Sequence, residues 1–377
     1  MKICGIICEY NPLHNGHIRH IEFSRRNADT VVCVMSGDFT QRGTPAIMDK
    51  YARAKHAVLA GADLVLELPA VFSVASAENF AYGGVRLLGA LKCGCISFGS
   101  ECGDIGLLER CADVLLNPPP PLKTAIKRNI ALGLSYPAAV ARALAGFDPE
   151  LNLLDKPNNL LAVEYLKQIK NLGLDMQPVT IKRGDNYNAT SVEGDFASAT
   201  ALRHALCTGD AQNLEKYLPP YVVSDLIPSA REKYQQFVYS FMNTATPKYL
   251  SAIEGVTEGI ENRILANVSR GSYAAMISAI KTKRYTLVKL QRILLCAILG
   301  ITKETVAAAK ETKPYPRVLA VRKDRMDLLS HIAREGVGTL TAPQKELAEI
   351  DVRASNIYSS LHGMYGNRDL TTPLQKI

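Results

Sequence analysis

The stretch Glu9-Tyr10-Asn11-Pro12-Leu13-His14-Asn15-Gly16-His17 follows directly on an apolar run, Ile3 to Cys8. The run predicts a buried first strand, and Asn11-Pro12 predicts a turn out of it. We expect a helix to begin near His14, which places His14 and His17 one turn apart on the same face. A helix N-terminus attracts phosphate through its free N–H groups and partial positive charge. The pattern therefore predicts a nucleotide site, in which both imidazoles stabilise a leaving pyrophosphate and Gly16 lets the nucleotide approach the backbone.

Two other interpretations of this stretch are open. The first is a helix cap with two solvated histidines. The second is a metal site formed by His14, His17 and His20, which the absence of a carboxylate or cysteine at ligand spacing disfavours. A separate group, Cys93, Cys95 and Cys102, is another arrangement that could hold a metal. We predict no metal held by protein ligands.

Composition describes an ordinary globular protein, with 47% hydrophobic and 21% charged residues in a chain of 377. The longest apolar stretches, such as Ile293 to Ile301, are too short to span a bilayer, and the N-terminus shows no signal-peptide pattern. The nine cysteines include no C-x-x-C pair, and several fall inside apolar runs. We expect a cytoplasmic protein with reduced thiols, no membrane contact and no obligate protein partner.

The first half of the chain alternates strand and helix patterns. Strands are expected at Val31–Met35, Asp63–Leu68, Cys95–Phe98 and Gln177–Ile181, and helices at Asp49–Ala60, Ala75–Leu91, Ile105–Leu116, Pro120–Leu132 and Asn158–Asn171. This alternation predicts an α/β fold with a Rossmann-like, doubly wound parallel sheet over residues 1–210. Such sheets bind ligands at the carboxyl ends of their strands.

From Leu214 onward the patterns are helical, apart from a short strand near Val318–Val321, so we predict a mostly helical domain over residues 211–377. The terminal segment Gly363–Ile377 is expected to be loosely ordered. Residues 1–204 carry 21 Lys and Arg against 20 Asp and Glu, whereas residues 205–377 carry 23 against 16. A basic second half favours a polyanionic partner such as RNA, although a solvated helical surface is the alternative.

A second phosphate-binding pattern is Ser198-Ala199-Thr200-Ala201-Leu202-Arg203. Ser198 is a good N-cap, Thr200 and the first-turn N–H groups can cradle phosphate oxygens, and Arg203 can bind the β- and γ-phosphates. Ordinary helix capping is the alternative. The phosphate-binding interpretation is strengthened because the histidine motif is predicted in the same domain.

Further loops carry polar groups at predicted strand ends. Ser36, Gly37, Gln41 and Arg42 follow the second strand and could hold a second substrate, unless the loop is a plain connection. Gly99 would let adenosine lie against the backbone. Lys182-Arg183 could reach the triphosphate, and Lys156-Pro157-Asn158-Asn159 could read a base or ribose. Surface charge and helix capping are the alternatives for the last two segments.

The paired H-x-G-H and S-x-T-x-x-R motifs are the signature of the H-x-G-H nucleotidyltransferase superfamily, and the whole chain resembles the tRNA(Met) cytidine acetate ligase family within it. The resemblance rests on Cys8 to His17 and on further matching segments: Met35 to Gly43, Phe98 to Glu101, Ser135 to Pro137, Lys156 to Asn159 and Lys281 to Tyr285.

The resemblance implies an enzyme that activates acetate with ATP and transfers the acetyl group to the exocyclic amine of the wobble cytidine of elongator tRNA(Met). From the chemistry of the residues we expect His14, His17 and Arg203 to be catalytic, and Mg²⁺ to be a partner of the triphosphate. The implied ATP contacts are Ile7, Cys8, Glu9, Tyr10, Asn11, Pro12, Leu13, His14, Asn15, Gly16, His17, Ile18, Arg19, His20, Gly99, either Asn158 or Asn159, and Arg183.

A cluster of cations in the helical half is the predicted contact for tRNA phosphates. It contains Lys281, Lys283, Arg284, Lys289 and Arg292, and a second group contains Arg317, Arg322, Lys323 and Arg325. Two functions remain as alternatives. One is an adenylyltransferase acting on a small phosphorylated substrate, and the other is a non-catalytic RNA-binding module.

Overall fold

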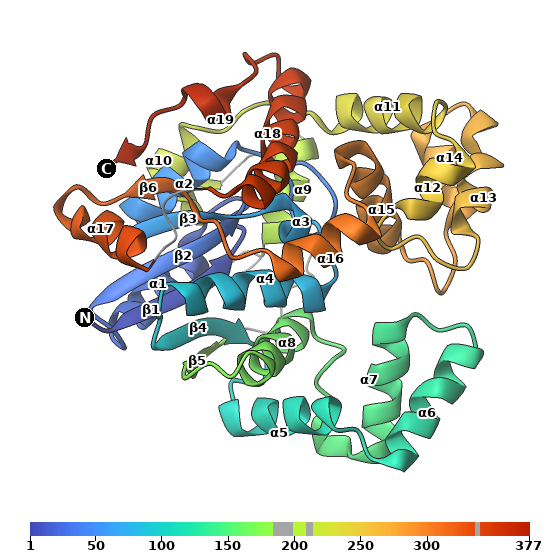
Figure 1. Ribbon diagram of the computed structural model, residues 1–377, viewed down its shortest axis with the longest axis horizontal. Coiled ribbons are helices and arrows are strands. Elements are labelled where there is room, and N and C mark those ends of the chain that lie inside the picture. The colour runs from blue at the N-terminus through green and yellow to red at the C-terminus, as the bar shows by residue number, and fades with distance from the viewer. Residues whose placement is uncertain (184–198, 209–213, 336–339) are drawn as a thin grey trace.

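The computed structural model describes residues 1–183, 199–208, 214–335 and 340–377. At its centre lies a seven-stranded sheet with the order β5-β4-β1-β2-β3-β6-β7 (Figure 1). Strands β1 to β5 are parallel, and β6 joins β3 in the antiparallel sense. The strands are β1 (Ile3–Cys8), β2 (Thr30–Ser36), β3 (Leu64–Leu68), β4 (Cys95–Ser100), β5 (Gln177–Lys182), β6 (Arg317–Val321) and β7 (Gln375–Lys376). The predicted α/β fold with a mostly parallel sheet is confirmed.

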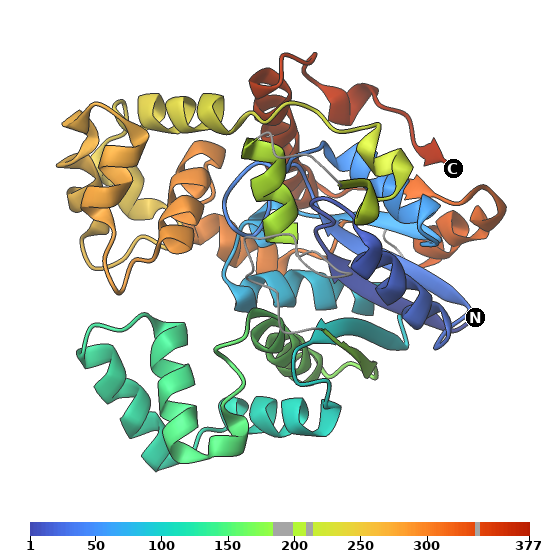
Figure 2. The same cartoon turned by 180° about the vertical axis from the view of Figure 1, so that it is seen from behind.

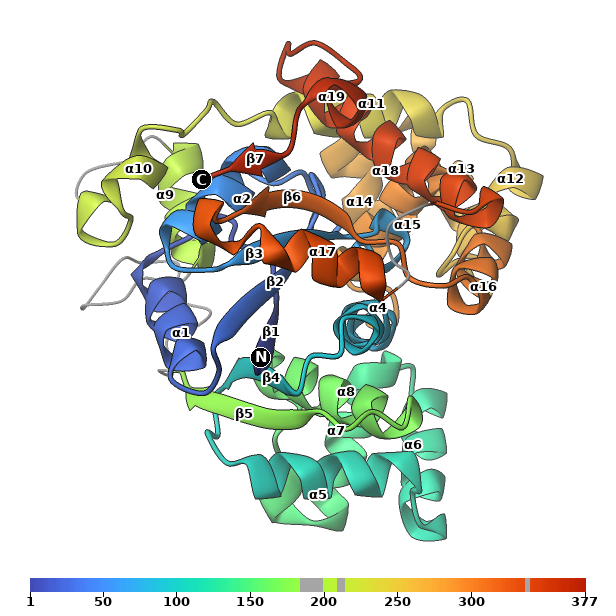
Figure 3. The same ribbon diagram turned by 60° about the vertical axis from the view of Figure 1, so that its left-hand side comes forward.

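Helices cover both faces of this sheet, as Figure 3 shows for α1 on one side and α4 on the other. Alternate residues of β2 enter two cores: Val31, Cys33 and Met35 pack with α1 and α2, whereas Val32 and Val34 pack with α4. Burial on both faces explains the continuous apolar runs of these strands. The covering helices are α1 (Asn15–Arg25), α2 (Lys50–Leu59), α9 (Ala199–Thr208) and α10 (Pro220–Val223) on one face, and α3 (Ala70–Ser73), α4 (Ala77–Ala90) and α8 (Pro157–Asn171) on the other.

Two groups of helices extend from the sheet on the same side of the molecule (Figures 1 and 2). The first, here named the α5–α7 lobe, comprises α5 (Ile105–Leu116), α6 (Pro120–Ala131) and α7 (Tyr136–Phe147). The second, the α11–α15 lobe, comprises α11 (Arg231–Met242), α12 (Pro247–Ala252), α13 (Ile260–Leu265), α14 (Tyr273–Ile280) and α15 (Leu287–Leu299). Short 3₁₀ turns lie at Pro149–Leu151, Leu214–Lys216, Val268–Arg270 and Lys323–Arg325.

After the second lobe the chain returns to the sheet. Helices α16 (Lys303–Glu311), α17 (Asp327–Arg334), α18 (Ala342–Leu361) and α19 (Arg368–Thr371) accompany β6 and β7. The sheet thus takes strands from both sides of residue 210, so the part of the chain after that residue does not stand apart from the sheet.

The expectation of a loosely ordered C-terminal segment was wrong. The side chain of Asp369 is fully buried, and its carboxylate pairs with Lys50 at 2.7 Å and with Arg317 at 3.0 Å. Strand β7 pairs with β6 at the edge of the sheet. The terminal residues are held because a buried cation on α2 requires their negative charge, which local sequence patterns do not reveal.

Candidate active site

A cavity of about 320 Å³ opens at the carboxyl ends of the parallel strands, where ligands of doubly wound sheets bind. Many of the predicted ATP contacts line it together with Gln41 and Arg42 from the predicted second-substrate loop. These lining residues are Ile7, Cys8, Glu9, Tyr10, Asn11, His17, His20, Gly99, Asn158, Arg183 and Arg203. The fold thus brings together loops after β1, β2, β4 and β5 and the start of α9.

The two motif histidines form a stacked pair at the start of α1. His14 is the N-cap, and its Nδ1 accepts a hydrogen bond from the Gly16 N–H at 3.1 Å. The Nδ1 of His17 accepts in turn from the His14 N–H at 3.3 Å, and the ring centroids lie 3.7 Å apart. Because each Nδ1 accepts, a neutral ring carries its proton on Nε2. The buried Nε2 of His14 has no hydrogen-bond partner among the described residues.

Burial and neighbouring cations keep these imidazoles neutral. Burial lowers the pKa of His14 to about 3, helped by the positive charges of Arg183 and Arg203. Burial likewise places the pKa of His17 well below its ordinary value. His20 has its pKa lowered by burial to about 3, and its Nε2 lies 2.9 Å from the Ser97 hydroxyl. In the absence of a ligand each ring is therefore neutral, so it can donate a hydrogen bond from Nε2–H but does not act as an acid.

Arg203 connects the second motif to the first. Its guanidinium donates to the carbonyl of Asn11 at 2.7 Å and to the Thr200 hydroxyl at 3.1 Å. Asn11 is fixed from the other side, because its Oδ1 accepts from the Ile47 N–H at 2.8 Å. The two motifs that the sequence analysis paired are therefore in direct contact, through the hydrogen bond from Arg203 to Asn11. Ser198, the predicted cap, lies outside the described residues.

The structure adds a packing reason for two glycines. A Cβ on Gly16 would lie 2.9 Å from Cε1 of His14, so the glycine makes room for that ring as well as leaving the backbone open to the predicted nucleotide. A Cβ on Gly99 would lie 2.5 Å from Cδ of Arg183. Gly99 therefore admits the arginine side chain into the cavity wall. The expectation that adenosine lies against the backbone at Gly99 stays a prediction.

The two candidate asparagines have different surroundings. The Oδ1 of Asn159 accepts the N–H groups of Glu101 and Cys102, so this side chain holds the loop after β4. Asn158 lines the cavity, donates through Nδ2 to Glu101 at 2.7 Å and accepts from Arg183 at 3.2 Å. The geometry favours Asn158 as the ligand contact.

The predicted second-substrate loop divides into two parts. The carbonyls of Ser36 and Gly37 accept hydrogen bonds from the guanidinium of Arg53, a fully buried residue of α2 that the sequence analysis missed. The same guanidinium donates to the Glu9 carbonyl at 2.7 Å. Gln41 and Arg42 line the cavity, and the Gln41 N–H donates to the Glu9 carboxylate at 2.7 Å.

Several other predicted contacts, including the buried N-cap His14, are not among the residues that line the cavity. Pro12 and Leu13 are buried behind the turn, and Arg19 is exposed. Asn15 bonds to the carbonyls of Lys216 and Tyr217. Thr200 and Ile18 are partly buried but are not among the residues that line the cavity.

Sequence reasoning also missed part of the cavity wall. The missed residues are mostly apolar or small and come from α4, α7 and α8: Ser76, Ala77, Phe80, Pro137, Leu160, Leu161 and Tyr165. Apolar residues at helical spacing predict only a buried face, so no chemical pattern marked them.

The cavity is strongly cationic. Among the described residues that line it, four are arginines (Arg42, Arg183, Arg203 and Arg292) and Glu9 is the one carboxylate. Low-dielectric walls strengthen such a field and favour a multiply charged anion such as a triphosphate.

The predicted tRNA-binding cations are not equivalent. Lys281 and Lys283 are exposed, whereas Arg284 pairs with Glu258 at 2.6 Å and donates to the carbonyl of Ile130 on α6 at 2.8 Å. Arg284 therefore joins the two lobes. Two others have partners or surroundings of a different kind, because Arg317 pairs with buried Asp369 and Arg292 lines the cavity.

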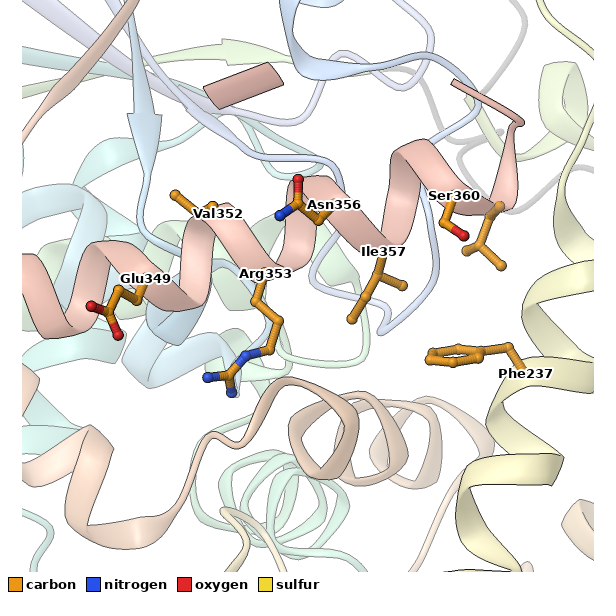
Figure 4. A pocket seen from close by; sticks show the side chains of 8 residues that line it. Phe237, Glu349, Val352, Arg353, Asn356, Ile357 and Ser360 are labelled. Carbon is orange, nitrogen blue, oxygen red and sulfur yellow. The ribbon is translucent and has the colours of Figure 1, made fainter. Parts of the chain in front are cut away.

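A second cavity, of about 470 Å³, lies between α11 and α18, with Phe237 facing α18 (Figure 4). Its two charged residues are Glu349 and Arg353, and Arg353 donates to the Leu299 carbonyl at 2.6 Å. It contains no pair of groups suited to phosphate chemistry, so we assign the candidate site to the first cavity.

No group of three or more His, Cys, Asp or Glu residues suited to a metal occurs within the described part of the chain. The eight cysteines described there, including Cys93, Cys95 and Cys102, are free thiols. No helix in the same residues is long and apolar enough to cross a membrane.

Known proteins resemble this chain over its full extent. A sequence model of the HIGH Nucleotidyl Transferase family matches residues 1–371. The tRNA(Met) cytidine acetate ligase of Clostridium perfringens is 36% identical over 96% of both chains, and that of Clostridium kluyveri is 39% identical over 96% of this chain and 95% of the relative.

Two solved structures also superimpose on this chain. Apo Thermotoga maritima TmcAL superimposes with a TM-score of 0.92 at 31% identity, and TmcAL bound with alpha-thio ATP superimposes with a TM-score of 0.90 at 30% identity. Both matches cover 100% of each chain. The chain belongs to the tRNA(Met) cytidine acetate ligase family of HIGH nucleotidyl transferases.

Proposed function

We propose that this protein activates acetate with ATP to acetyl-adenylate and transfers the acetyl group to the N4 amine of the wobble cytidine of elongator tRNA(Met). The observation that carries the proposal is the stacked pair of neutral imidazoles of His14 and His17, which lies beside Arg203 at the carboxyl ends of the parallel strands. Relatives with this ligase name and a similar structure bound to an ATP analogue support it.

The first step needs positioning and charge stabilisation. A carboxylate oxygen of acetate attacks the α-phosphorus, the bond to the bridging oxygen breaks, and pyrophosphate leaves with the electron pair. Acetate is already a nucleophile, so no general base is required. The Nε2–H groups of His14 and His17 and the Arg203 guanidinium stabilise the negative charge that moves to the leaving group.

In the second step the exocyclic amine of cytidine attacks the acetyl carbonyl carbon. The bond from that carbon to the phosphate oxygen breaks, AMP leaves with the electron pair, and the amine loses a proton to solvent. Cys8 lines the cavity with His17 and His20, but no hydrogen bond joins Cys8 to either ring among the described residues, and burial raises the pKa of the Cys8 thiol. We therefore propose direct transfer without an acyl-enzyme.

The lining residues do not form a Mg²⁺ site of their own, since Glu9 is the one carboxylate among those described and it accepts the Gln41 N–H. We propose that Mg²⁺ enters with the triphosphate, coordinated by phosphate oxygens and water. Exposed Lys281 and Lys283 are proposed to contact tRNA phosphates. A cytoplasmic location suits these substrates and the free thiols.

The test is incubation with ATP, labelled acetate and total tRNA, followed by digestion and identification of the labelled nucleoside. Label in N4-acetylcytidine, together with acetate-dependent ATP–pyrophosphate exchange, is expected. An adenylyltransferase for small phosphorylated substrates would leave tRNA unlabelled. A non-catalytic RNA-binding module would show no exchange.

A further inference from the structure

Arg292 is one of the cavity cations that the mechanism above does not use. It lies on α15, in the second half of the chain, yet it lines the same cavity as His17 and Arg203. Its guanidinium makes no hydrogen bond or ion pair with another part of the described chain. Burial lowers the pKa of Arg292 below its ordinary value. A desolvated cation without a counter-ion is costly, so its retention in a cavity indicates an anionic ligand.

The position of Arg292 indicates which side of the cavity the anion occupies. A Cβ on Gly43 would lie 2.6 Å from the backbone N of Arg292, so the loop after β2 lies directly against α15 at this residue. In the strand order, β2 lies on one side of β1, and β4 and β5 lie on the other. Arg292 thus approaches from the β2 side, whereas Gly99 and Arg183 stand at β4 and β5.

This arrangement separates two anion positions. His14, His17 and Arg203 stand at the end of β1 and the start of α9, where the triphosphate is proposed to bind. The attacking acid must reach the α-phosphate from the side away from the departing pyrophosphate. On the β2 side the wall offers Arg292, Gln41 and the start of α4 at Ser76–Ala77. A planar guanidinium matches a carboxylate through two parallel hydrogen bonds.

We propose that Arg292 binds the carboxylate of the acyl donor and orients its oxygen toward the α-phosphate. This inference rests on the proposed function and adds a substrate-binding residue to it. The helical lobe then supplies part of the activation site in addition to RNA contacts. Acetate binding accordingly depends on α15 resting against the loop after β2.

The test measures ATP–pyrophosphate exchange without tRNA over a series of acetate concentrations. Arg292→Ala is expected to raise the KM for acetate about 10- to 100-fold, because one charge-assisted interaction is removed, while the KM for ATP stays within about twofold. Arg292→Lys keeps the charge but not the planar fork, so its KM for acetate should be intermediate. The matched control is Lys233→Ala, which removes an exposed cation from α11, a helix that contacts α15.

A bypass experiment separates acetate binding from other roles. When synthetic acetyl-adenylate and tRNA are supplied, Arg292→Ala should transfer the acetyl group at the wild-type rate, because no free carboxylate has to be bound. Loss of transfer would assign Arg292 to tRNA, and a rise in the KM for ATP would assign it to the triphosphate. Either result, or an unchanged KM for acetate, overturns the proposal. Absence of acetate-dependent exchange in the wild type would instead reject the proposed function.

Discussion

Two clusters of buried charge in this protein are built differently. Around Asp369 the charges pair with one another: Lys50 lies 2.8 Å from Glu67 and 2.7 Å from Asp369, and Arg317 lies 3.0 Å from Asp369. The cavity instead gathers four arginines with the single carboxylate Glu9 among its described lining residues.

The difference separates structural charge from ligand-binding charge. A closed cluster neutralises itself and fixes the C-terminal segment to α2 and β6, whereas an open cluster leaves positive potential for an anion to complete. Removing charge from the first should therefore affect stability, and removing donors from the second should affect binding and rate.

The largest expected effect is on the closed cluster. Asp369→Asn should lower the free energy of unfolding by about 3–5 kcal/mol, because Lys50 and Arg317 are then left in a buried site with insufficient counter-charge. Chemical denaturation measures this. Asp324→Asn is the matched control: Asp324 pairs with Arg322 at 2.6 Å but its side chain is 68% exposed, and no measurable change is expected. Equal destabilisation of both variants would contradict the distinction.

The next effect is on the histidine pair beside the open cluster. His14→Ala and His17→Ala should each lower the rate of acetate-dependent ATP–pyrophosphate exchange about 10²- to 10³-fold, the usual cost of removing one donor to developing charge. The thermal unfolding temperature should fall far less than for Asp369→Asn. Normal exchange rates in both variants would remove the imidazoles from the mechanism.

A smaller effect is expected for Arg203→Ala. Removing a charge-assisted hydrogen bond to phosphate should weaken ATP binding by about 1.5–3 kcal/mol, measured by calorimetry. The tRNA affinity should change little, because Arg203 lies in the cavity at the carboxyl ends of the strands rather than on the α11–α15 lobe. The opposite pattern, with ATP binding intact and tRNA binding abolished, would contradict its assignment to the triphosphate.

The smallest effect concerns exposed cations, which belong to neither cluster. Replacing Lys281 and Lys283 by alanine should weaken tRNA binding and reduce the slope of log affinity against log salt by about 0.7–0.9 for each lysine–phosphate interaction removed. Acetyl-adenylate formation should survive. The slope is measured across a salt series, and slopes identical to the wild type would exclude these residues from RNA recognition.

Arg284→Ala provides a useful contrast in the same assay. Its ion pair with Glu258 lies within its own lobe, and its hydrogen bond to the Ile130 carbonyl joins the two lobes, so we expect its removal to act through lobe arrangement. The salt slope should change less than in the lysine variant, because Arg284 already has a protein partner.

The sequence by itself determined the fold class and the position of the H-x-G-H motif. Apolar runs of strand length, such as Ile3 to Cys8, matched β1, and helix α5 began and ended where its pattern predicted. The H-x-G-H stretch was recognisable because a turn, a helix start and two histidines at fixed spacing are local properties. These signals require no knowledge of distant residues.

Tertiary structure alone decided which distant side chains meet. The pairing of Asp369 with Lys50 joins residues at opposite ends of the chain, and Arg292 enters the cavity because α15 packs on the loop at Gly43. The roles of Asn158 and Asn159, adjacent and identical in sequence, differ because one faces the cavity and the other faces the loop after β4. Such differences arise from packing between elements, which spacing along the chain does not encode.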